Sequence, residues 1–373
     1  MILLKPASRT LWGKRTGVSA GLLGVLCALG ELCFLLPDLL VTKDALPFYK
    51  DHIGFLRGLL QTTILATFVL GAASVLMLRS KVHGLLGIAL GSIALLMGGS
   101  EAEPVEVGRR AISAGLDYLV LELLVLGLVF VPLERLFSLH EQRIFRAGWQ
   151  TDLKHFFVSH AGVQLISLAS MVPAQALFAS SVKLEFQQAV AAQPYWLQFL
   201  EILLAVDLVA YWVHRAFHKI PVLWNFHAIH HSSRQLDWLA GSRMHVVDVF
   251  LTRAAGFLPV FLLGFAPPPL YAYIALVSFH AVYIHSNTRW RWPVLRWIIT
   301  TPEFHHWHHT SDEEGIDKNF AGMLPALDVA FRSAHQPDYW PKNYGTVKFQ
   351  PPESWFGQLI YPFRRHRSGT PYG

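Results

Sequence analysis

Residues 195–231 read YWLQFLEILLAVDLVAYWVHRAFHKIPVLWNFHAIHH, an apolar run that ends directly in histidines. The first part, 195–213, is long and apolar enough for a membrane-crossing helix. The histidines that follow form an HxxxH motif, His214 and His218, and an HxxHH motif, His227, His230 and His231. This stretch predicts a helix that brings imidazoles to one end of a membrane-embedded bundle.

A third histidine motif lies further along the chain, in His305-His306-Trp307-His308-His309. Spacings of three and four residues place side chains on one face of a helix, so each motif presents its imidazoles in one direction. Pro221 predicts a break between the first two motifs, which lets the second fold back on the first. Thr301 and Pro302 read as the N-cap and first turn of a helix that carries the third motif.

The composition of the whole chain agrees with a membrane protein. Of 373 residues 53% are hydrophobic and only 15% charged, with mean hydropathy +0.37. Soluble domains carry about a quarter charged residues. Apolar runs occur at 17–41, 58–79, 83–99, 115–137, 153–180, 195–213, 247–265 and 268–285, the last four as two pairs that are spanning or re-entrant hairpins. We therefore expect an all-α, multi-pass helical membrane protein with a cytoplasmic, histidine-rich helical cap that holds a dimetal site.

The net charge of +6 comes from basic residues that flank the apolar runs. Such residues set topology and meet anionic lipid head groups, so nucleic acid is not an expected partner. The positive-inside rule places the histidine motifs in the cytoplasm. Basic arms and the absence of retrieval signals favour a bacterial inner membrane over the endoplasmic reticulum. The cysteines, Cys27 and Cys33, both fall in the first apolar run and build neither a disulfide framework nor a thiolate metal site.

Composition changes near residue 110, since nearly all of the 19 histidines follow it. We expect an accessory transmembrane region over 1–110, the working domain over 111–365 and a C-terminal tail over 366–373.

The number of imidazoles bears on the number of metal ions. Without His306, the three motifs supply eight, and one zinc ion takes four ligands in a closed site. Two metal ions fit better. Imidazole suits zinc, copper, iron and nickel, so the ligand type does not identify the metal. The chain has no HExxH, and Glu303-Phe-His-His306 is a lone copy of the Glu-x-x-His motif that soluble di-iron proteins use twice.

The ordered motifs resemble those of the fatty acid hydroxylase / sterol desaturase superfamily, the membrane-bound histidine-box di-iron oxygenases, in a bacterial-type member. The resemblance covers about residues 115–335. It includes 130–135 (FVPLER), 146–152 (RAGWQTD), 207–218 (DxxxYxxHRxxH), 285–287 (HSN), 301–310 (TPEFHHWHHT) and 317–320 (DKNF). Ala321 departs from the glycine that usually closes the last of these patterns.

The resemblance implies a set of metal ligands and of residues behind them. The ligands would be His214, His218, His227, His230, His231, His285, His305, His308 and His309, with His280 as a further candidate. His306 occupies a variable position of the pattern. Residues that would orient the ligands are Asp207, Arg243, His245, Asp248, Asp317 and Asn319.

The resemblance also implies an activity: O2-dependent hydroxylation or desaturation of a C–H bond in a membrane lipid, with two iron ions as cofactor and O2 as co-substrate. The implied partners are the lipid substrate, the bilayer and a separate electron donor of the cytochrome b5 or ferredoxin type. Fatty acyl, sterol, ether and carotenoid-like lipids all remain open. Two alternatives are a zinc-dependent membrane hydrolase and a non-enzymatic metal or proton transporter.

Overall fold

The computed structural model describes residues 6–41, 46–99, 115–161 and 176–364. These residues form helices and loops, with only two isolated β-bridges, Ser138–Thr288 and Thr310–Tyr344. The predicted all-α class is confirmed. The chain divides into two compact units, Met1–Leu123 and Leu124–Gly373, a boundary that falls inside a helix and follows the change in composition near residue 110.

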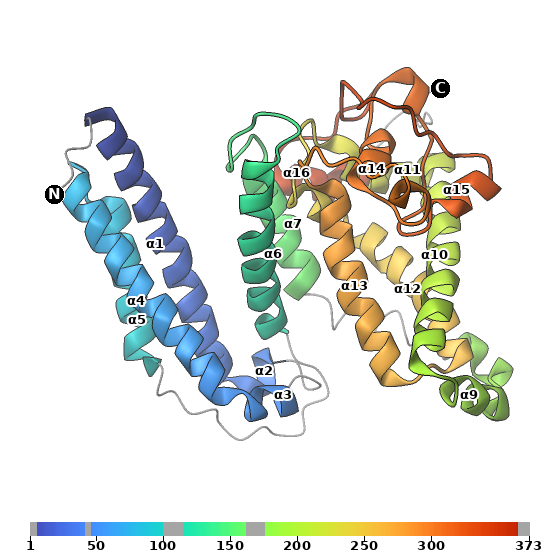
Figure 1. The fold of residues 1–373 in the computed structure, drawn as a ribbon, viewed down its shortest axis with the longest axis horizontal. Helices are drawn as coiled ribbons and strands as arrows, with labels where there is room; N and C mark the ends of the chain where they lie inside the picture. The colour runs from blue at the N-terminus through green and yellow to red at the C-terminus, as the bar shows by residue number, and fades with distance from the viewer. Residues whose placement is uncertain (1–5, 42–45, 100–114, 162–175, 365–373) are drawn as a thin grey trace. The chain divides into compact units, whose positions relative to one another are not determined.

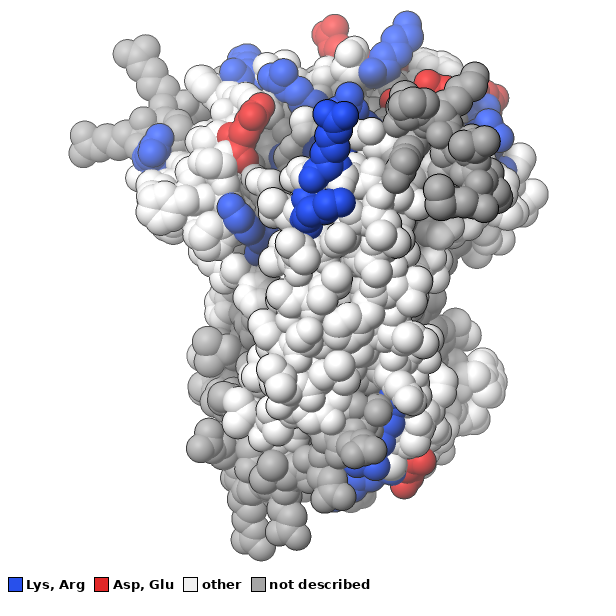
Figure 2. Space-filling model, turned by 90° about the vertical axis from the view of Figure 1, so that its left-hand side faces the viewer, with Lys and Arg blue, Asp and Glu red and all other residues white. Residues whose placement is uncertain are grey.

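In the described part of the chain, five helices are long and apolar enough to cross a membrane. They span Thr10–Leu35, Ile53–Met77, Leu116–Leu136, Tyr195–Lys219 and Val246–Leu263. The face of the molecule in Figure 2 carries a broad band without blue or red side chains, with Lys and Arg gathered above and below it. A helical multi-pass architecture is therefore supported by length, by composition and by the distribution of charge.

Three of the remaining expected runs take other forms. Run 83–99 is a shorter helix, Val82–Leu96, and run 268–285 is the helix Pro267–His285, which is not among the five candidates. Run 153–180 begins as the helix Trp149–Ala161 and then leaves the described residues.

The first unit packs α1 (Pro6–Leu35) against α4 (Ile53–Met77) and α5 (Val82–Leu96), beside the short helices α2 (Pro37–Leu40) and α3 (Leu46–Asp51). Small residues let these backbones approach closely, as membrane helices commonly do. A methyl group added at Gly87 would lie 2.5 Å from the Ala20 Cβ, and one at Gly84 would lie 2.6 Å from the Gly71 carbonyl oxygen.

The second unit is organised around α10 (Tyr195–Lys219), which packs on α11 (Pro221–His227), α12 (Val246–Leu263) and α13 (Pro267–His285). The short helix α14 (Pro302–His308) packs on α13. Other elements are α6 (Leu116–Leu136), α7 (Trp149–Ala161), α9 (Leu184–Ala191), α15 (Ala326–Ala330) and α16 (Trp355–Ile360). In Figure 1, α11, α14, α15 and α16 form a cap of short helices and loops at one end of the long helices of this unit.

Candidate dimetal centre

Nine histidines from four segments, carried by α10, α11 with the turn after it, α13 and α14, lie close together. They form two groups. The five-histidine group is His214, His218, His227, His231 and His308, and the four-histidine group is His230, His285, His305 and His309. Within each group, one nitrogen per ring lies within 4.8 Å of the others. The eight histidines of the three motifs, without His306, and His285 are thus brought together in two groups. Two groups agree with the expected two metal ions.

The local structure follows the two predicted helix signals. Helix α10 ends at Lys219 and α11 begins at Pro221, so the chain turns between the first two motifs. Thr301 caps α14, because its hydroxyl accepts a hydrogen bond from the Phe304 N–H. Both predictions from sequence are confirmed.

The four-histidine group has its Nε2 atoms facing one another. His285 Nε2 lies 2.9 Å from His305 Nε2, 3.1 Å from His309 Nε2 and 3.3 Å from His230 Nε2. His305 and His309 Nε2 are 3.0 Å apart. Nitrogens that share a tetrahedral metal ion at about 2.0–2.1 Å lie about 3.3 Å apart, which is close to this spacing.

The five-histidine group also has converging nitrogens, and three of them lack a hydrogen-bond partner. His214 and His227 Nε2 are 3.0 Å apart. The Nε2 atoms of His218, His231 and His308 are buried and have no hydrogen-bond partner. A buried polar nitrogen without a partner is costly, and a cation held between these rings would remove that cost.

Burial keeps these imidazoles in the form that binds metal. Burial, followed by neighbouring imidazoles, holds the pKa of His230, His231, His305 and His309 well below the usual range. Burial likewise lowers the pKa of His308 to about 3. The rings are therefore neutral at physiological pH, with a lone pair available for a metal ion.

One loop, residues 317–320, supports three imidazoles of the five-histidine group. His218 Nδ1 lies 3.2 Å from Asp317 Oδ1, His308 Nδ1 lies 2.9 Å from the Lys318 carbonyl, and His214 Nδ1 lies 2.7 Å from the Phe320 carbonyl. Asp317 and Asn319 have left-handed backbone angles, φ +55° and +58°, which Asp and Asn tolerate better than most residues. This turn aims successive acceptors at the histidines.

Two buried carboxylates hold the backbone of this loop. Asp328 accepts the N–H groups of Phe320 and Ala321, both at 2.8 Å. Asp207 accepts those of Met323 and Leu324, at 3.0 and 2.7 Å. The predicted role of Asp207 is to orient an imidazole, but its carboxylate instead accepts backbone N–H groups just after this loop.

The fifth ring of this group, His227, has a carboxylate partner, since its Nδ1 lies 2.7 Å from Asp248 Oδ2. Asp248 and Asp317 therefore stand where the resemblance placed them, behind metal-ligand candidates.

The four-histidine group is supported by carbonyls instead. His230 Nδ1 lies 3.2 Å from the Arg243 carbonyl, and His285 Nδ1 lies 2.6 Å from the Ala281 carbonyl one turn back in α13. His305 Nδ1 is buried without a hydrogen-bond partner.

The Arg243 carbonyl is itself held by a buried ionic network that sequence reasoning did not find. Arg243 Nε pairs with Asp152, and Arg146 Nη2 lies 2.6 Å from Asp152 Oδ2 and 2.7 Å from Asp237 Oδ1. The sequence predicts that Arg243 orients a ligand. In the structure its carbonyl faces the His230 ring, while its side chain pairs with Asp152 and so holds the residue in place. Residues 146–152 belong to the stretch that resembles the superfamily, but nothing in their spacing links them to residue 243.

Three further histidines and one asparagine lie outside both groups. His280 Nε2 donates to the Thr300 carbonyl at 2.7 Å, so the structure does not place it with the ligands. His306 contacts the Tyr344 hydroxyl and the Ser286 carbonyl, in keeping with its variable position. His245 caps α12 by accepting from Val247 N–H. Asn319 contacts the backbone of Phe304 and His335 rather than an imidazole.

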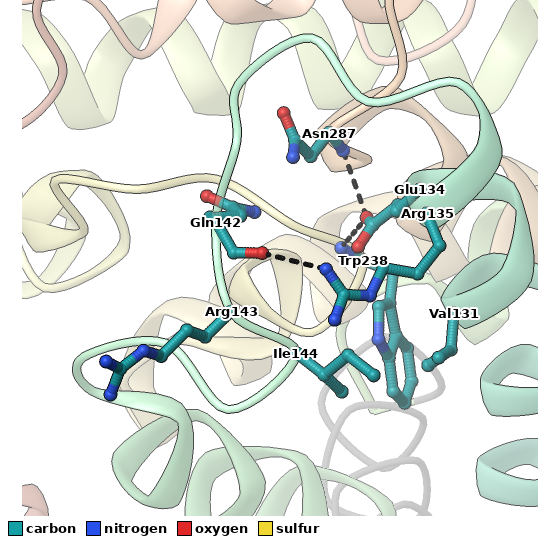
Figure 3. Close-up of a pocket in the computed structure, with 8 residues that line it drawn as sticks. All are labelled: Val131, Glu134, Arg135, Gln142, Arg143, Ile144, Trp238 and Asn287. Atoms are coloured by element: carbon teal, nitrogen blue, oxygen red, sulfur yellow. Dashed lines mark hydrogen bonds between the residues drawn. The ribbon is translucent and has the colours of Figure 1, made fainter. Parts of the chain in front are cut away.

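A pocket lies beside the end of α6, lined by Val131, Glu134, Arg135, Gln142, Arg143, Ile144, Trp238 and Asn287 (Figure 3). Glu134 Oε1 accepts the backbone N–H groups of Trp238, at 2.7 Å, and Asn287, at 3.0 Å. Because Asn287 follows His285 closely in the chain, Glu134 ties the end of α6 to the segment that leaves the four-histidine group.

Comparison with known proteins agrees with this site. Residues 199–333 match the family model described as fatty acid hydroxylase. The chain is 26% identical over 270 residues to ornithine lipid hydroxylase OlsE of Rhizobium tropici, covering 66% of this chain and 77% of that protein. It is 33% identical over 129 residues to human alkylglycerol monooxygenase, covering 34% of this chain and 28% of that protein. No solved structure matches. The matched region contains all nine clustered histidines, and the resemblance to this superfamily is confirmed.

Proposed function

We propose that this protein, which carries a fatty acid hydroxylase domain over residues 199–333, is an O2-dependent oxygenase that hydroxylates or desaturates a C–H bond of a membrane lipid. The observation that carries the proposal is the convergence of nine buried histidines into groups of five and four. Two groups of this size suit two metal ions and exceed the needs of one.

The residues fit two iron ions. Neutral imidazoles with inward Nε2 atoms are suitable ligands for iron, and six of the nine have their Nδ1 atoms held by carboxylates or carbonyls, as is usual for metal-bound histidines. When bound, two iron ions would supply the redox chemistry that O2 activation needs and that zinc lacks. Hydroxylation places one oxygen atom of O2 in the lipid and the other in water, with two electrons supplied by a reductant.

The protein's own contribution is to orient the ligands and to exclude water. Asp248 and the loop 317–320 fix the ring orientation and tautomer of four imidazoles in the five-histidine group. Phe217, Phe304 and Phe320 are fully buried beside the motifs. A dry, apolar surrounding protects a strong oxidant from side reactions.

We propose a polar membrane lipid as the substrate and one of its alkyl or acyl chains as the point of reaction. The proposal is supported by the apolar helices that lead to the site and by the relatives, whose names refer to ornithine lipid and alkylglycerol. The electrons would come from a separate carrier of the cytochrome b5 or ferredoxin type. We place the histidine groups on the cytoplasmic side, in a bacterial inner membrane.

The test is lipid analysis of cells that express the chain, grown under 18O2, beside cells that express His308→Ala. We expect a new labelled lipid alcohol, or a new unlabelled alkene, only with the unaltered chain. A lipid change that continues without O2 would indicate the hydrolase alternative and contradict the proposal.

The transporter alternative expects polar side chains distributed along the membrane spans. Here the clustered histidines lie at one end of α10 and α13 and in the cap. This distribution favours a single reaction site.

A further inference from the structure

Residues 289–298, RWRWPVLRWI, connect α13 to α14 and so lie between the ligand candidates His285 and His305. The segment includes only one short element, the 3-10 turn Leu295–Trp297, and lies outside the five candidate spans. Neither the proposed chemistry nor the resemblance gives this segment a role.

Two arginines of this segment pair with a buried carboxylate. Arg291 Nη2 lies 2.6 Å and Arg296 Nη1 lies 3.2 Å from Oε1 of the buried Glu303, although the Arg291 side chain remains 38% exposed. Both guanidinium groups also approach the exposed Asp338, at 3.6 and 3.1 Å.

The apolar side chains of the segment point outward instead. Exposed fractions are 43% for Trp292, 74% for Val294, 39% for Leu295, 48% for Trp297 and 61% for Ile298. Contiguous exposed apolar side chains of this kind mark a contact surface rather than a solvated loop.

The start of the segment contacts the residues that directly follow α6, a candidate membrane span. The Arg289 N–H donates to the Phe137 carbonyl at 2.9 Å, Thr288 pairs with Ser138, and the rings of Phe137 and Trp290 lie 5.0 Å apart. Candidate span α6 ends at Leu136, one residue earlier. Tryptophan and arginine are the residues that concentrate where a bilayer meets water.

We propose that residues 289–298 form an in-plane membrane anchor, with Trp292, Val294, Leu295, Trp297 and Ile298 inserted at the boundary between lipid head groups and acyl chains. The bilayer is favoured over a protein partner because the outward face is continuous with the end of an apolar span. It is also favoured because two of the three arginines of the segment, Arg291 and Arg296, are already paired with the carboxylates of Glu303 and Asp338. The proposal does not depend on metal binding.

The anchor has a consequence for the site. Because the segment lies in the short connection between His285 and His305, its depth in the bilayer constrains the depth of the four-histidine group. Lipid chains would then reach that group near the head-group boundary rather than at the bilayer centre.

The experiment uses the full-length protein in vesicles of phosphatidylcholine with a minority of phosphatidylglycerol. Cys27 and Cys33 are replaced by Ala, and Ile298→Cys carries an environment-sensitive fluorophore. The control is Val347→Cys, half-exposed on a cap loop. Val294→Cys gives an independent reading, and neither anchor variant removes a buried side chain.

We expect lipids brominated on the acyl chain to quench the label at 298 and 294 about threefold more strongly than at 347. Iodide in the water should show the opposite order. Since no other protein is present, quenching by brominated lipid can come only from the bilayer. Equal quenching at 298 and 347, or stronger iodide quenching at 298, would overturn the proposal and leave the segment as a surface for a protein partner.

Discussion

The five-histidine and four-histidine groups lie side by side but are supported by different chemistry. In the five-histidine group, two rings face the carboxylates of Asp248 and Asp317. In the four-histidine group, the Nδ1 atoms of His230 and His285 face carbonyls, and that of His305 has no partner. A carboxylate makes an imidazole a stronger ligand. If each group binds an ion as proposed, this difference predicts tighter binding in the larger group than in the smaller.

The largest expected effect comes from removing one ring from each group. His305→Ala leaves three imidazoles and should reduce bound iron to about one ion per chain, whereas His308→Ala leaves four and should retain more. Lipid oxidation should fall by about 1,000-fold or more in both variants. Metal analysis of the purified proteins measures the first effect. His306→Gln, from the same helix but outside both groups, is the control. Full activity in His308→Ala would refute the ligand assignment.

The next effect tests the carboxylates. Asp248→Asn keeps the shape of the side chain but removes its charge, and should weaken iron binding in the five-histidine group by about 10- to 100-fold. Titration with a competing chelator measures this. Asp338→Asn, at an exposed carboxylate, is the matched control. If the two variants release iron alike, the proposed difference between the groups has no electrostatic basis.

A smaller effect should be specific to the four-histidine group. Asp152→Asn loosens Arg243, whose carbonyl faces His230, and should weaken iron binding in that group by about tenfold. Iron in the five-histidine group should be retained, which separates a positioning role from general unfolding. The chelator titration would then show two well-separated release steps. Parallel loss of both ions would mean that the network only stabilises the fold.

The smallest expected effect is a pH dependence of stability, which follows from the burial of the imidazoles. Burial lowers the pKa of His308 to about 3, while an unfolded histidine titrates near 6.5. The unfolded chain therefore binds more protons, and the stability of the iron-free protein should be full above about pH 6.5 and fall as the pH drops toward 3. We expect His308 alone to account for a loss of about 1 kcal/mol between about pH 7.5 and 5.5. Thermal unfolding of chelator-treated protein in detergent measures it, and an unchanged midpoint would contradict the burial of neutral rings.

The clustered histidines could be predicted from the sequence, but most of the residues that hold their rings in place could not. Helical spacing and the signals at Pro221 and Thr301 place imidazoles on common faces, so local chemistry is enough to find them. Their division into five and four depends on how α11 turns, since His230 and His231 are neighbours in the chain but belong to different groups. Periodicity cannot reveal that division.

The supporting residues were harder to predict because many act through the backbone. Lys318 and Phe320 contribute carbonyls, which every residue has, so their side chains give no signal. Asp152 and Arg243 are paired across a long stretch of chain, and only tertiary packing brings them together. His280 and His245 show the converse. The sequence suggests a ligand at His280 and a ligand-orienting residue at His245, but His280 bonds to the Thr300 carbonyl and His245 caps a helix.

The order of the ligand candidates along the chain also bears on biosynthesis. When translation has reached residue 231, His214, His218, His227 and His231 of the five-histidine group have been made, but only His230 of the other group. The smaller group is completed only when α14 emerges from the ribosome and folds onto α13. If the groups bind metal as proposed, four of the five ligands for one ion are present early in synthesis, while the other ion has to wait for the last motif.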